Sequence, residues 1–216
     1  MFQNRQEAGK LLSKKLKAYK NDRSSIVLAI VRGGVVVGAE ISKELNIPLE
    51  GIVVRKLGAP DNQELAIGAV SMLQTTYIDR DMVKSTGTGE DYYSFQISAK
   101  IREVEEMVND LQISPDNLLK YSNFILTDDG IATGATIQAA ILTINKLNFK
   151  ENKKHKIVLA VPVASGDVLR IFKKKLGKII VIEEAENFGS VGQYYSEFDQ
   201  VDNEMVIKIL NKYRRN

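Results

Sequence analysis

Short continuous runs of apolar residues alternate with amphipathic stretches along most of this chain. Five of the runs have the length and β-branched content of strands that are buried on both faces. They are Ile26–Val31, Leu49–Val54, Phe124–Thr127, Ile157–Val161 and Ile179–Ile182. Apolar residues recur at helical spacing between them, over Val35–Leu45, Thr136–Leu147 and Asp167–Lys175. This alternation predicts an α/β fold with a doubly wound, mainly parallel open sheet.

Helical patterns are also present near both ends of the sequence. Asn4 followed by Glu7 makes a start like a capping box, and we expect an N-terminal helix within residues 2–20. A final helix is expected from about Asp202 to Tyr213. A charged helix, Ile101–Leu111, should be closed by the Ser-Pro pair that follows it.

Residues 58–94 interrupt the alternation of strands and helices. Glycines and polar residues here surround two strand-like pieces, Leu65–Leu73 and Thr76–Ile78, which favours a β-hairpin or flap with a mobile loop. The segment Gly87–Glu90 contains two glycines and is expected to act as a flexible joint. We therefore expect a flexible β flap attached to the main sheet.

The composition is that of a globular protein. Of the 216 residues 44% are hydrophobic and 26% are charged, and we expect one domain over residues 1–216, with its core at about residues 24–182. No apolar run approaches the roughly 20 residues of a membrane span, and the first residues lack the pattern of an export leader. We expect a cytoplasmic protein that contacts no membrane.

The charged and metal-binding residue types narrow the chemistry. The chain has no cysteine and one histidine, which excludes disulfides and thiolate or zinc clusters and leaves a hard cation held by oxygen. Thirty basic residues against twenty-seven acidic ones give a net charge of +3. This excess is too small to predict nucleic-acid binding unless it gathers on one face, and it suits an anionic small molecule.

The most informative segment is Phe124–Thr136, in which an apolar strand leads into two carboxylates, a Gly/Thr loop and a helix. At the carboxyl end of a parallel strand, Asp128 and Asp129 can accept hydrogen bonds from a ribose diol and help to hold a hydrated Mg²⁺. The loop offers backbone amides at a helix N-terminus, where a phosphate is favoured. Alternatively, the aspartates cap the helix and the glycines make the turn.

This segment resembles the signature with which type I phosphoribosyltransferases bind phosphoribosyl pyrophosphate (PRPP). The resemblance covers roughly residues 5–212 and is closest to a prokaryotic branch whose members often lack an assigned base. It implies that Asp128 and Asp129 are catalytic, orient the ribose and hold Mg²⁺ through water or ribose hydroxyls. It implies that the 5-phosphate binds to the loop of Gly130, Ile131, Ala132, Thr133, Gly134, Ala135 and Thr136. It also implies a homodimer.

A second part of the resemblance concerns the loop after the first apolar run. Arg32, Gly33 and Gly34 stand there, and glycine lets the backbone approach an anion. In the resembled family this loop binds the pyrophosphate, its strand lies beside the strand of the PRPP signature, and its first peptide bond, here Val31–Arg32, is often cis. Arg32 is therefore a further candidate catalytic residue.

Two more basic residues, Arg55 and Lys56, are expected at the end of the second strand. The resemblance implies that both bind the pyrophosphate, that Lys56 is catalytic, and that a flexible lid follows it. Such a lid excludes water from a reactive intermediate. Alternatively, both are surface residues at a strand end.

The acceptor base is the least determined partner. The resemblance implies a small hood, formed by residues 2–20 and 183–216, in which Phe188 stacks on the base; alternatively, Phe188 is a core aromatic. Two departures from the family are visible. Ala132 stands where enzymes for 6-oxopurines have an aspartate, and residues 162–166 contain no lysine. The base and any general base stay unassigned.

The reaction implied is transfer of the 5-phosphoribosyl group from PRPP to a nitrogenous base, purine or pyrimidine, with release of pyrophosphate in nucleotide salvage. A different class of function, a PRPP- or nucleotide-binding regulator without catalysis, is opposed by the two intact carboxylates. A nucleic-acid-binding protein would rest on the charge balance alone, so we expect no nucleic-acid partner.

Overall fold

A computed structural model describes residues 1–151 and 155–214 of the chain. Its main sheet has five parallel strands in the order β2-β1-β6-β7-β8. The strands are β1 (Ser25–Ile30), β2 (Leu49–Ile52), β6 (Asn123–Thr127), β7 (Lys156–Ser165) and β8 (Lys178–Ala185). Each strand contains most of one predicted apolar run. The strand order reverses beside β1, because β2 lies on one side of β1 and the later strands β6, β7 and β8 lie on the other. The predicted doubly wound α/β fold is confirmed.

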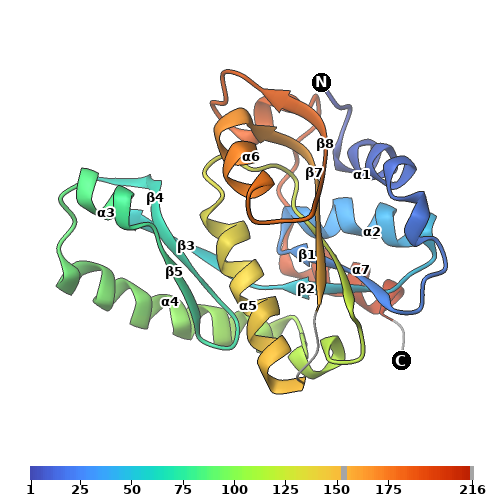
Figure 1. The fold of residues 1–216 in the computed structure, drawn as a ribbon, viewed down its shortest axis with the longest axis horizontal. Coiled ribbons are helices and arrows are strands. Elements are labelled where there is room, and N and C mark those ends of the chain that lie inside the picture. Colours follow the sequence, from blue (N-terminus) through green and yellow to red (C-terminus); the bar gives the residue numbers. More distant parts are fainter. Residues whose placement is uncertain (152–154, 215–216) are drawn as a thin grey trace.

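Helices cover both faces of this sheet, which is why its central strands β1 and β6 are mostly apolar. As Figure 1 shows, three of them lie on one face: α1 (Arg5–Lys15), α2 (Gly33–Leu45) and α7 (Asn203–Tyr213). On the other face lie α5 (Ala135–Glu151) and α6 (Gly166–Lys173). None of the helices in the described part of the chain is long and apolar enough to cross a membrane.

A second, antiparallel sheet projects to one side of the molecule (Figure 1). It consists of β3 (Val54–Ala59), β4 (Asn62–Ser71) and β5 (Thr75–Ile78), and it is followed by α3 (Arg80–Ser85) and the long α4 (Glu90–Asp110). The predicted piece Thr76–Ile78 falls within β5, and Leu65–Leu73 overlaps β4 but runs two residues past its end at Ser71. The small antiparallel β flap is confirmed. The glycine-containing joint lies between α3 and α4.

The second predicted strand was wrong at its end. The run Leu49–Val54 was taken as one strand, but β2 ends at Ile52 and the chain passes directly into the small sheet. The Val53 carbonyl already belongs to that sheet, because it accepts hydrogen bonds from Ser71 Oγ at 3.0 Å and from the Met72 amide at 3.2 Å. Arg55 and Lys56 therefore lie in β3 and not at the end of a main-sheet strand.

Two helix boundaries also differ from those expected. The α1 helix begins as predicted, since Asn4 Oδ1 accepts from the Glu7 amide at 3.1 Å and Glu7 Oε2 accepts from the Gln3 amide at 2.6 Å. It ends at Lys15, and a short 3₁₀ turn continues to Tyr19. The α4 helix begins at Glu90, well before the predicted Ile101. Its first turns contain apolar residues that are only partly buried, such as Tyr93 and Ile97.

The two ends of the fold meet above the carboxyl edge of the main sheet. Phe2 pairs with Tyr195 in an isolated parallel bridge, and the Phe2 amide donates to the Tyr194 carbonyl at 2.7 Å. Around this bridge lies a small hydrophobic cluster of Phe2, Ala8, Val163, Ala185 and Tyr195. We call this cap of residues 1–8 and 186–199 the hood. The last two residues of the predicted hood segment, 215–216, lie outside the described residues.

Candidate active site

The loops after β1 and β6 leave the sheet side by side. The two strands are parallel neighbours, with Ala29 opposite Thr127, so both loops open at the same carboxyl edge, next to the point where the strand order reverses. The peptide bond between Val31 and Arg32 is cis, as the resemblance implied. Arg32 then stands at the N-cap position of α2, where it is exposed and makes no side-chain cap hydrogen bond.

Gly33 and Gly34 lie directly against the two carboxylates. A Cβ atom on Gly34 would lie 2.9 Å from the Asp128 Cα atom and 3.0 Å from Asp128 Oδ1. A Cβ atom on Gly33 would overlap Asp129 Oδ2. Because Gly33 and Gly34 have no Cβ atom, the predicted pyrophosphate loop can lie next to the predicted ribose-binding pair.

Asp129 is held from the side of the hood. Arg5 Nε donates to Asp129 Oδ2 at 2.8 Å, and Tyr195 Oη donates to the Asp129 carbonyl at 2.6 Å. The Asp129 amide donates in turn to Asp128 Oδ1 at 2.9 Å. The two carboxyl side chains are also hydrogen-bonded to each other. Together they keep acceptor capacity that can serve a ligand.

Burial makes ionisation of both carboxyl groups unfavourable. It raises the pKa of Asp128 well above its usual value, and the charge of Asp129 adds to this effect. Burial also raises the pKa of Asp129, whereas the Arg5 cation acts in the opposite direction. A hydrated cation or the hydroxyl groups of a sugar would relieve this concentration of negative charge.

Residues 130–136 form a tethered loop between β6 and α5. Ile131 bonds to the end of β7 through both of its backbone groups, with the Val163 carbonyl at 3.0 Å and the Ser165 amide at 3.2 Å. Gly134 has φ of +80°, a left-handed conformation that favours glycine. A Cβ atom there would also lie 2.9 Å from the Phe172 ring.

The amides of this loop are available to a ligand. Within the described residues, the N–H groups of residues 132–137 donate to no protein acceptor. They stand at the N-terminus of α5, where unpaired amides and the helix dipole favour an anion. The loop therefore has the properties of a phosphate site.

A cavity of about 1480 Å³ faces these groups. Lys56, Phe188, the carboxylate pair and all of the loop except Ala135 line it. The sequence-predicted residues that do not line it are Arg32, Gly33, Gly34, Arg55 and Ala135. One cavity thus joins most of the predicted site, with the glycines lying behind the carboxylates.

The hood closes one side of the cavity. A Cβ atom on Gly130 would lie 2.7 Å from Val191 Cγ1, so the hood packs directly on the start of the loop. The Phe188 ring lies 5.3 Å from the Tyr194 ring, centroid to centroid. Phe188 packs against the hood cluster and also lines the cavity, so its two predicted environments occur together.

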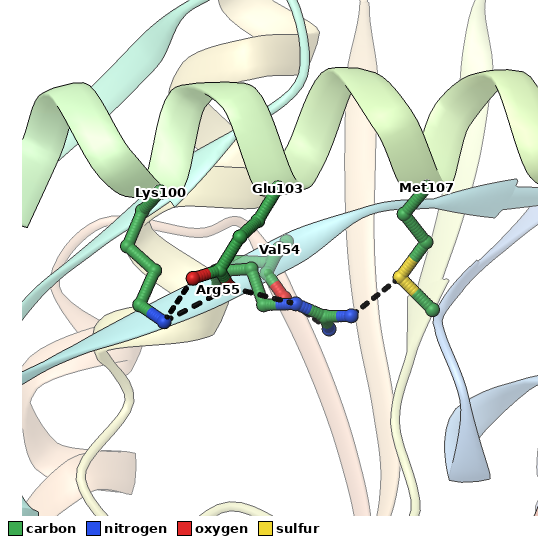
Figure 2. A network of polar contacts seen from close by, with 5 residues as sticks. All are labelled: Val54, Arg55, Lys100, Glu103 and Met107. Atoms are coloured by element: carbon green, nitrogen blue, oxygen red, sulfur yellow. Dashed lines mark hydrogen bonds and ion pairs between the residues drawn. The ribbon is translucent and has the colours of Figure 1, made fainter.

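Arg55 is held against α4 by the contacts drawn in Figure 2. Arg55 Nη2 lies 2.6 Å from Met107 Sδ, and Arg55 Nε lies 3.9 Å from Glu103 Oε2, which also pairs with Lys100. Burial and the charge of Arg32 lower the pKa of Arg55. A bound anion beside these two guanidinium groups would relieve their mutual repulsion.

Lys56 points into the cavity but is not free. Lys56 Nζ lies 2.8 Å from Glu64 Oε2 and donates to the Glu64 carbonyl at 3.1 Å. Both residues line the cavity from the antiparallel sheet. A pyrophosphate that recruits Lys56 must therefore compete with the carboxylate of Glu64.

The carboxylate pair has the composition of a magnesium site with mostly water ligands. Nowhere in residues 1–151 and 155–214 do three or more His, Cys, Asp or Glu side chains gather as metal ligands. Two carboxylates remain, and Mg²⁺ commonly binds proteins through one or two carboxylates while it keeps several waters and binds substrate phosphates. The residues present therefore fit a Mg²⁺ that arrives with a phosphorylated ligand.

Several residues of the site were not candidates from the sequence. Arg5, Tyr195 and Val191 belong to the hood, and Glu64 lies in β4. One weak signal in the sequence points to Arg5. A cation in the first turn of a helix interacts unfavourably with the helix dipole, which indicates that another interaction holds Arg5 there.

Comparisons with known proteins give a consistent picture. The model of the phosphoribosyl transferase domain matches residues 3–197. A Mycobacterium tuberculosis H37Rv protein with the name "Putative phosphoribosyl transferase Rv0571c" is 31% identical over 216 residues, which are 100% of this chain and 47% of that protein. The chain thus spans about half the length of this curated relative.

Two solved structures share the fold. The crystal structure of TT1426 from Thermus thermophilus matches with a TM-score of 0.75 and 29% identity, and the match covers 99% of each chain. The AQ2163 protein from Aquifex aeolicus matches with a TM-score of 0.51 and 14% identity, over 87% of this chain and 78% of that one. The second match is a similarity of fold alone.

Proposed function

Because the chain belongs to the phosphoribosyl transferase domain family, we propose that it is an enzyme that transfers the 5-phosphoribosyl group of PRPP to a nitrogenous base. The acceptor is a purine or pyrimidine, and pyrophosphate leaves. The observation that carries this proposal is the continuity of two ligand sites in one cavity. A carboxylate pair suited to a diol is followed at once by a loop of unpaired amides suited to a phosphate.

The proposed roles follow from the chemistry of PRPP. Asp128 and Asp129 accept hydrogen bonds from the ribose 2- and 3-hydroxyls, and the amides and hydroxyls of the loop, residues 130–136, bind the 5-phosphate. This arrangement fixes the sugar at two ends, so that its C1 atom is presented to the acceptor in line with the leaving group.

We assign the leaving pyrophosphate to Arg32, Arg55 and Lys56 and to the amides of Gly33 and Gly34. Of these, Lys56 lines the cavity, the loop that begins at Arg32 lies against the carboxylate pair, and Arg55 precedes Lys56 in β3. Bound Mg²⁺, held by Asp128 and Asp129 through water or ribose hydroxyls, would neutralise part of the charge that develops on the leaving group. Lys56 adds charge once it leaves Glu64.

Phe188 is the proposed stacking residue for the acceptor, because it presents a half-buried ring to the cavity. No general base is assigned, since residues 162–166 offer no lysine. We further propose that residues 1–216 form one domain that acts in cytoplasmic nucleotide salvage as a homodimer, without nucleic-acid or membrane partners. These last points rest on the family resemblance and on the composition.

Release of pyrophosphate from PRPP, measured with Mg²⁺ and a panel of purine and pyrimidine bases, tests the proposal. We expect base-dependent release by the natural chain and none by the Asp128→Asn/Asp129→Asn double variant, which should stay folded because it changes the site and not the core. If PRPP binds but no base supports turnover, the chain is a PRPP-binding regulator. Equal activity in the double variant would contradict the site assignment.

A further inference from the structure

Glu184 lines the cavity from β8, on the far side of the carboxylate pair from the pyrophosphate loop. Its register partner in β7 is Ala164, and β8 is two strands from β6 in the sheet order β2-β1-β6-β7-β8. The loop after β1, which is assigned to the pyrophosphate, lies on the other side of β6. The carboxylate pair at the end of β6 therefore stands between the assigned leaving group and Glu184.

The acceptor is expected on the side of Glu184. A nitrogen that displaces pyrophosphate approaches C1 of the ribose in line with the bond that breaks, from the face opposite the leaving group. Phe188, the proposed stacking residue, lines the same cavity four positions after Glu184. A base that stacks on this ring presents its edge to the polar groups around it. Those polar groups then decide which edge is bound.

The Glu184 carboxylate accepts no hydrogen bond from residues 1–151 and 155–214. A Cβ atom on Gly166 would lie 3.2 Å from Glu184 Oε1, so the absence of a side chain at the start of α6 leaves room for this oxygen. Lys173 Nζ lies 3.9 Å from Glu184 Oε2, which is beyond hydrogen-bond length. Gly166 lines the cavity, whereas Lys173 does not. Oε1 is therefore an open acceptor beside the cavity wall.

The other charged residues that line this part of the cavity are Asp167, Arg170 and Glu186. Arg170 Nη2 pairs with Asp167 Oδ1 within α6, so each of these two residues already has a partner. Glu186 follows Ala185, the last residue of β8, and no strand pairing fixes its direction. Glu184 is thus the carboxylate whose backbone is fixed by the sheet and whose oxygens are open to a ligand.

We propose that Glu184 is a specificity-determining residue that accepts a hydrogen bond from an exocyclic amino group of the acceptor base. An ionised carboxylate can only accept hydrogen bonds, so it favours an amino group and repels an oxo group at the same position of the ring. The charge strengthens this hydrogen bond. The substrate class is therefore amino-substituted bases. This inference rests on the proposed function, because the bound PRPP defines where the acceptor lies.

The test compares three pairs of bases in which an oxo group replaces one amino group: adenine and hypoxanthine, guanine and xanthine, and cytosine and uracil. The kcat/KM for each base is measured at saturating PRPP and Mg²⁺, in the natural chain and in Glu184→Gln. This variant keeps the shape of the side chain but replaces one acceptor oxygen by a donor amide.

Glu183→Gln is the matched control. Successive residues of a strand point to opposite faces of the sheet, and Glu183 pairs with the Met1 amino group at 3.5 Å instead of lining the cavity. The control removes the same charge from the neighbouring position. It therefore separates a contact with the base from a general change of charge.

In at least one pair the natural chain should prefer the amino-substituted base by about 10-fold to 100-fold, the scale of a hydrogen bond to a charged group. Glu184→Gln should lose this preference and gain activity with the oxo base, and Glu183→Gln should keep it. Equal or greater activity with the oxo base in all three pairs would overturn the inference. So would an unchanged preference in Glu184→Gln, or an equal loss in Glu183→Gln.

A binding measurement separates this inference from the proposed catalysis. Calorimetric Kd values for AMP and IMP, GMP and XMP, and CMP and UMP report the same edge of the base without turnover. If no base is turned over, the proposed function fails. A tighter Kd for an amino-substituted nucleotide that is lost in Glu184→Gln would still support the role of Glu184. Equal Kd values within every pair, or no binding of any of the six, would overturn it.

Discussion

Gly33 and Asp129 are in such close contact that a side chain at position 33 would displace the Asp129 carboxylate. A Cβ atom there would overlap Asp129 Oδ2 and would lie 3.0 Å from Arg5 Nε. The obstacle is the end of a side chain and not the backbone of a neighbouring strand. The carboxylate can therefore turn away to admit a methyl group, but it then leaves both Arg5 and the ribose position.

We predict from this contact that Gly33→Ala damages the site more than the fold. Displacing Asp129 should lower kcat/KM for PRPP by about 100-fold, the typical cost of misplacing a group by an ångström. The free energy of unfolding should fall by about 1 to 3 kcal/mol, as for other overpacked positions. Steady-state kinetics and denaturant unfolding on the same preparation measure both effects.

Gly177→Ala is the matched control, because a Cβ atom on Gly177 would meet nothing within 4 Å. Its kinetics should be unchanged, and its stability should stay within about 0.5 kcal/mol of the natural protein. If Gly33→Ala behaves like this control, the two predicted loops are not in functional contact.

Asp128 gives a prediction of stability against pH. Its folded pKa is raised above about 3.9, the value for an unfolded chain. The folded state therefore binds the proton more tightly, and this contribution to stability is present below about pH 3.9 and is lost as the pH rises through the folded pKa. Removing the charge should consequently stabilise the ligand-free protein at high pH only.

We expect Asp128→Asn to raise the Tm at pH 8, by about 2 to 4 °C for each kcal/mol relieved, and to change it little at pH 4. Thermal unfolding followed by circular dichroism at both pH values measures the difference. Asp61→Asn, which removes an exposed carboxylate from the hairpin of β3 and β4, should show the same small change at both. A Tm for Asp128→Asn that falls at pH 8 would mean that Asp128 is stabilising as an anion.

The ion pair between Lys56 and Glu64 predicts that removing the Glu64 charge increases the affinity of the protein for PRPP. If Lys56 must leave Glu64 Oε2 to bind pyrophosphate, then Glu64→Gln should lower the KM for PRPP by about twofold to fivefold, the scale of an exposed ion pair. The gain should shrink in high salt, which screens exposed charges. Asp61→Asn changes the net charge equally without touching Lys56, and its KM should not move. An unchanged or higher KM in Glu64→Gln would show that Lys56 does not bind the substrate.

The main sheet was predictable because its strands are buried on both faces and leave continuous apolar runs. The border between β2 and β3 left no such mark. Ile52, Val53 and Val54 are all buried, although they belong to one sheet, a connection and another sheet. An unbroken apolar run therefore crosses from one sheet to the other, and only the partners of the Val53 carbonyl reveal the break.

The carboxylate pair and the proposed phosphate loop were predictable because they are contiguous in the sequence. Strand, acidic residues, loop and helix start all lie in the segment Phe124–Thr136. Arg5 was not predictable, because its partner Asp129 is 124 positions away and only the folded hood brings them together. The first turns of α4 were missed for a related reason. Val104 and Met107 are its buried residues, whereas the apolar residues of the earlier turns, such as Tyr93 and Ile97, are only partly buried.

The cavity lined by the carboxylate pair and the loop of residues 130–136 is proposed to bind PRPP with Mg²⁺, and the Tm of the natural chain with and without both ligands tests this most directly. A ligand bound only by the folded state at about 100 times its Kd adds about 2.7 kcal/mol, which for a chain of this size is a rise of about 5 to 10 °C. We predict such a rise for the natural chain and its loss in the Asp128→Asn/Asp129→Asn double variant. An unchanged Tm of the natural chain at millimolar PRPP with Mg²⁺ would contradict the account.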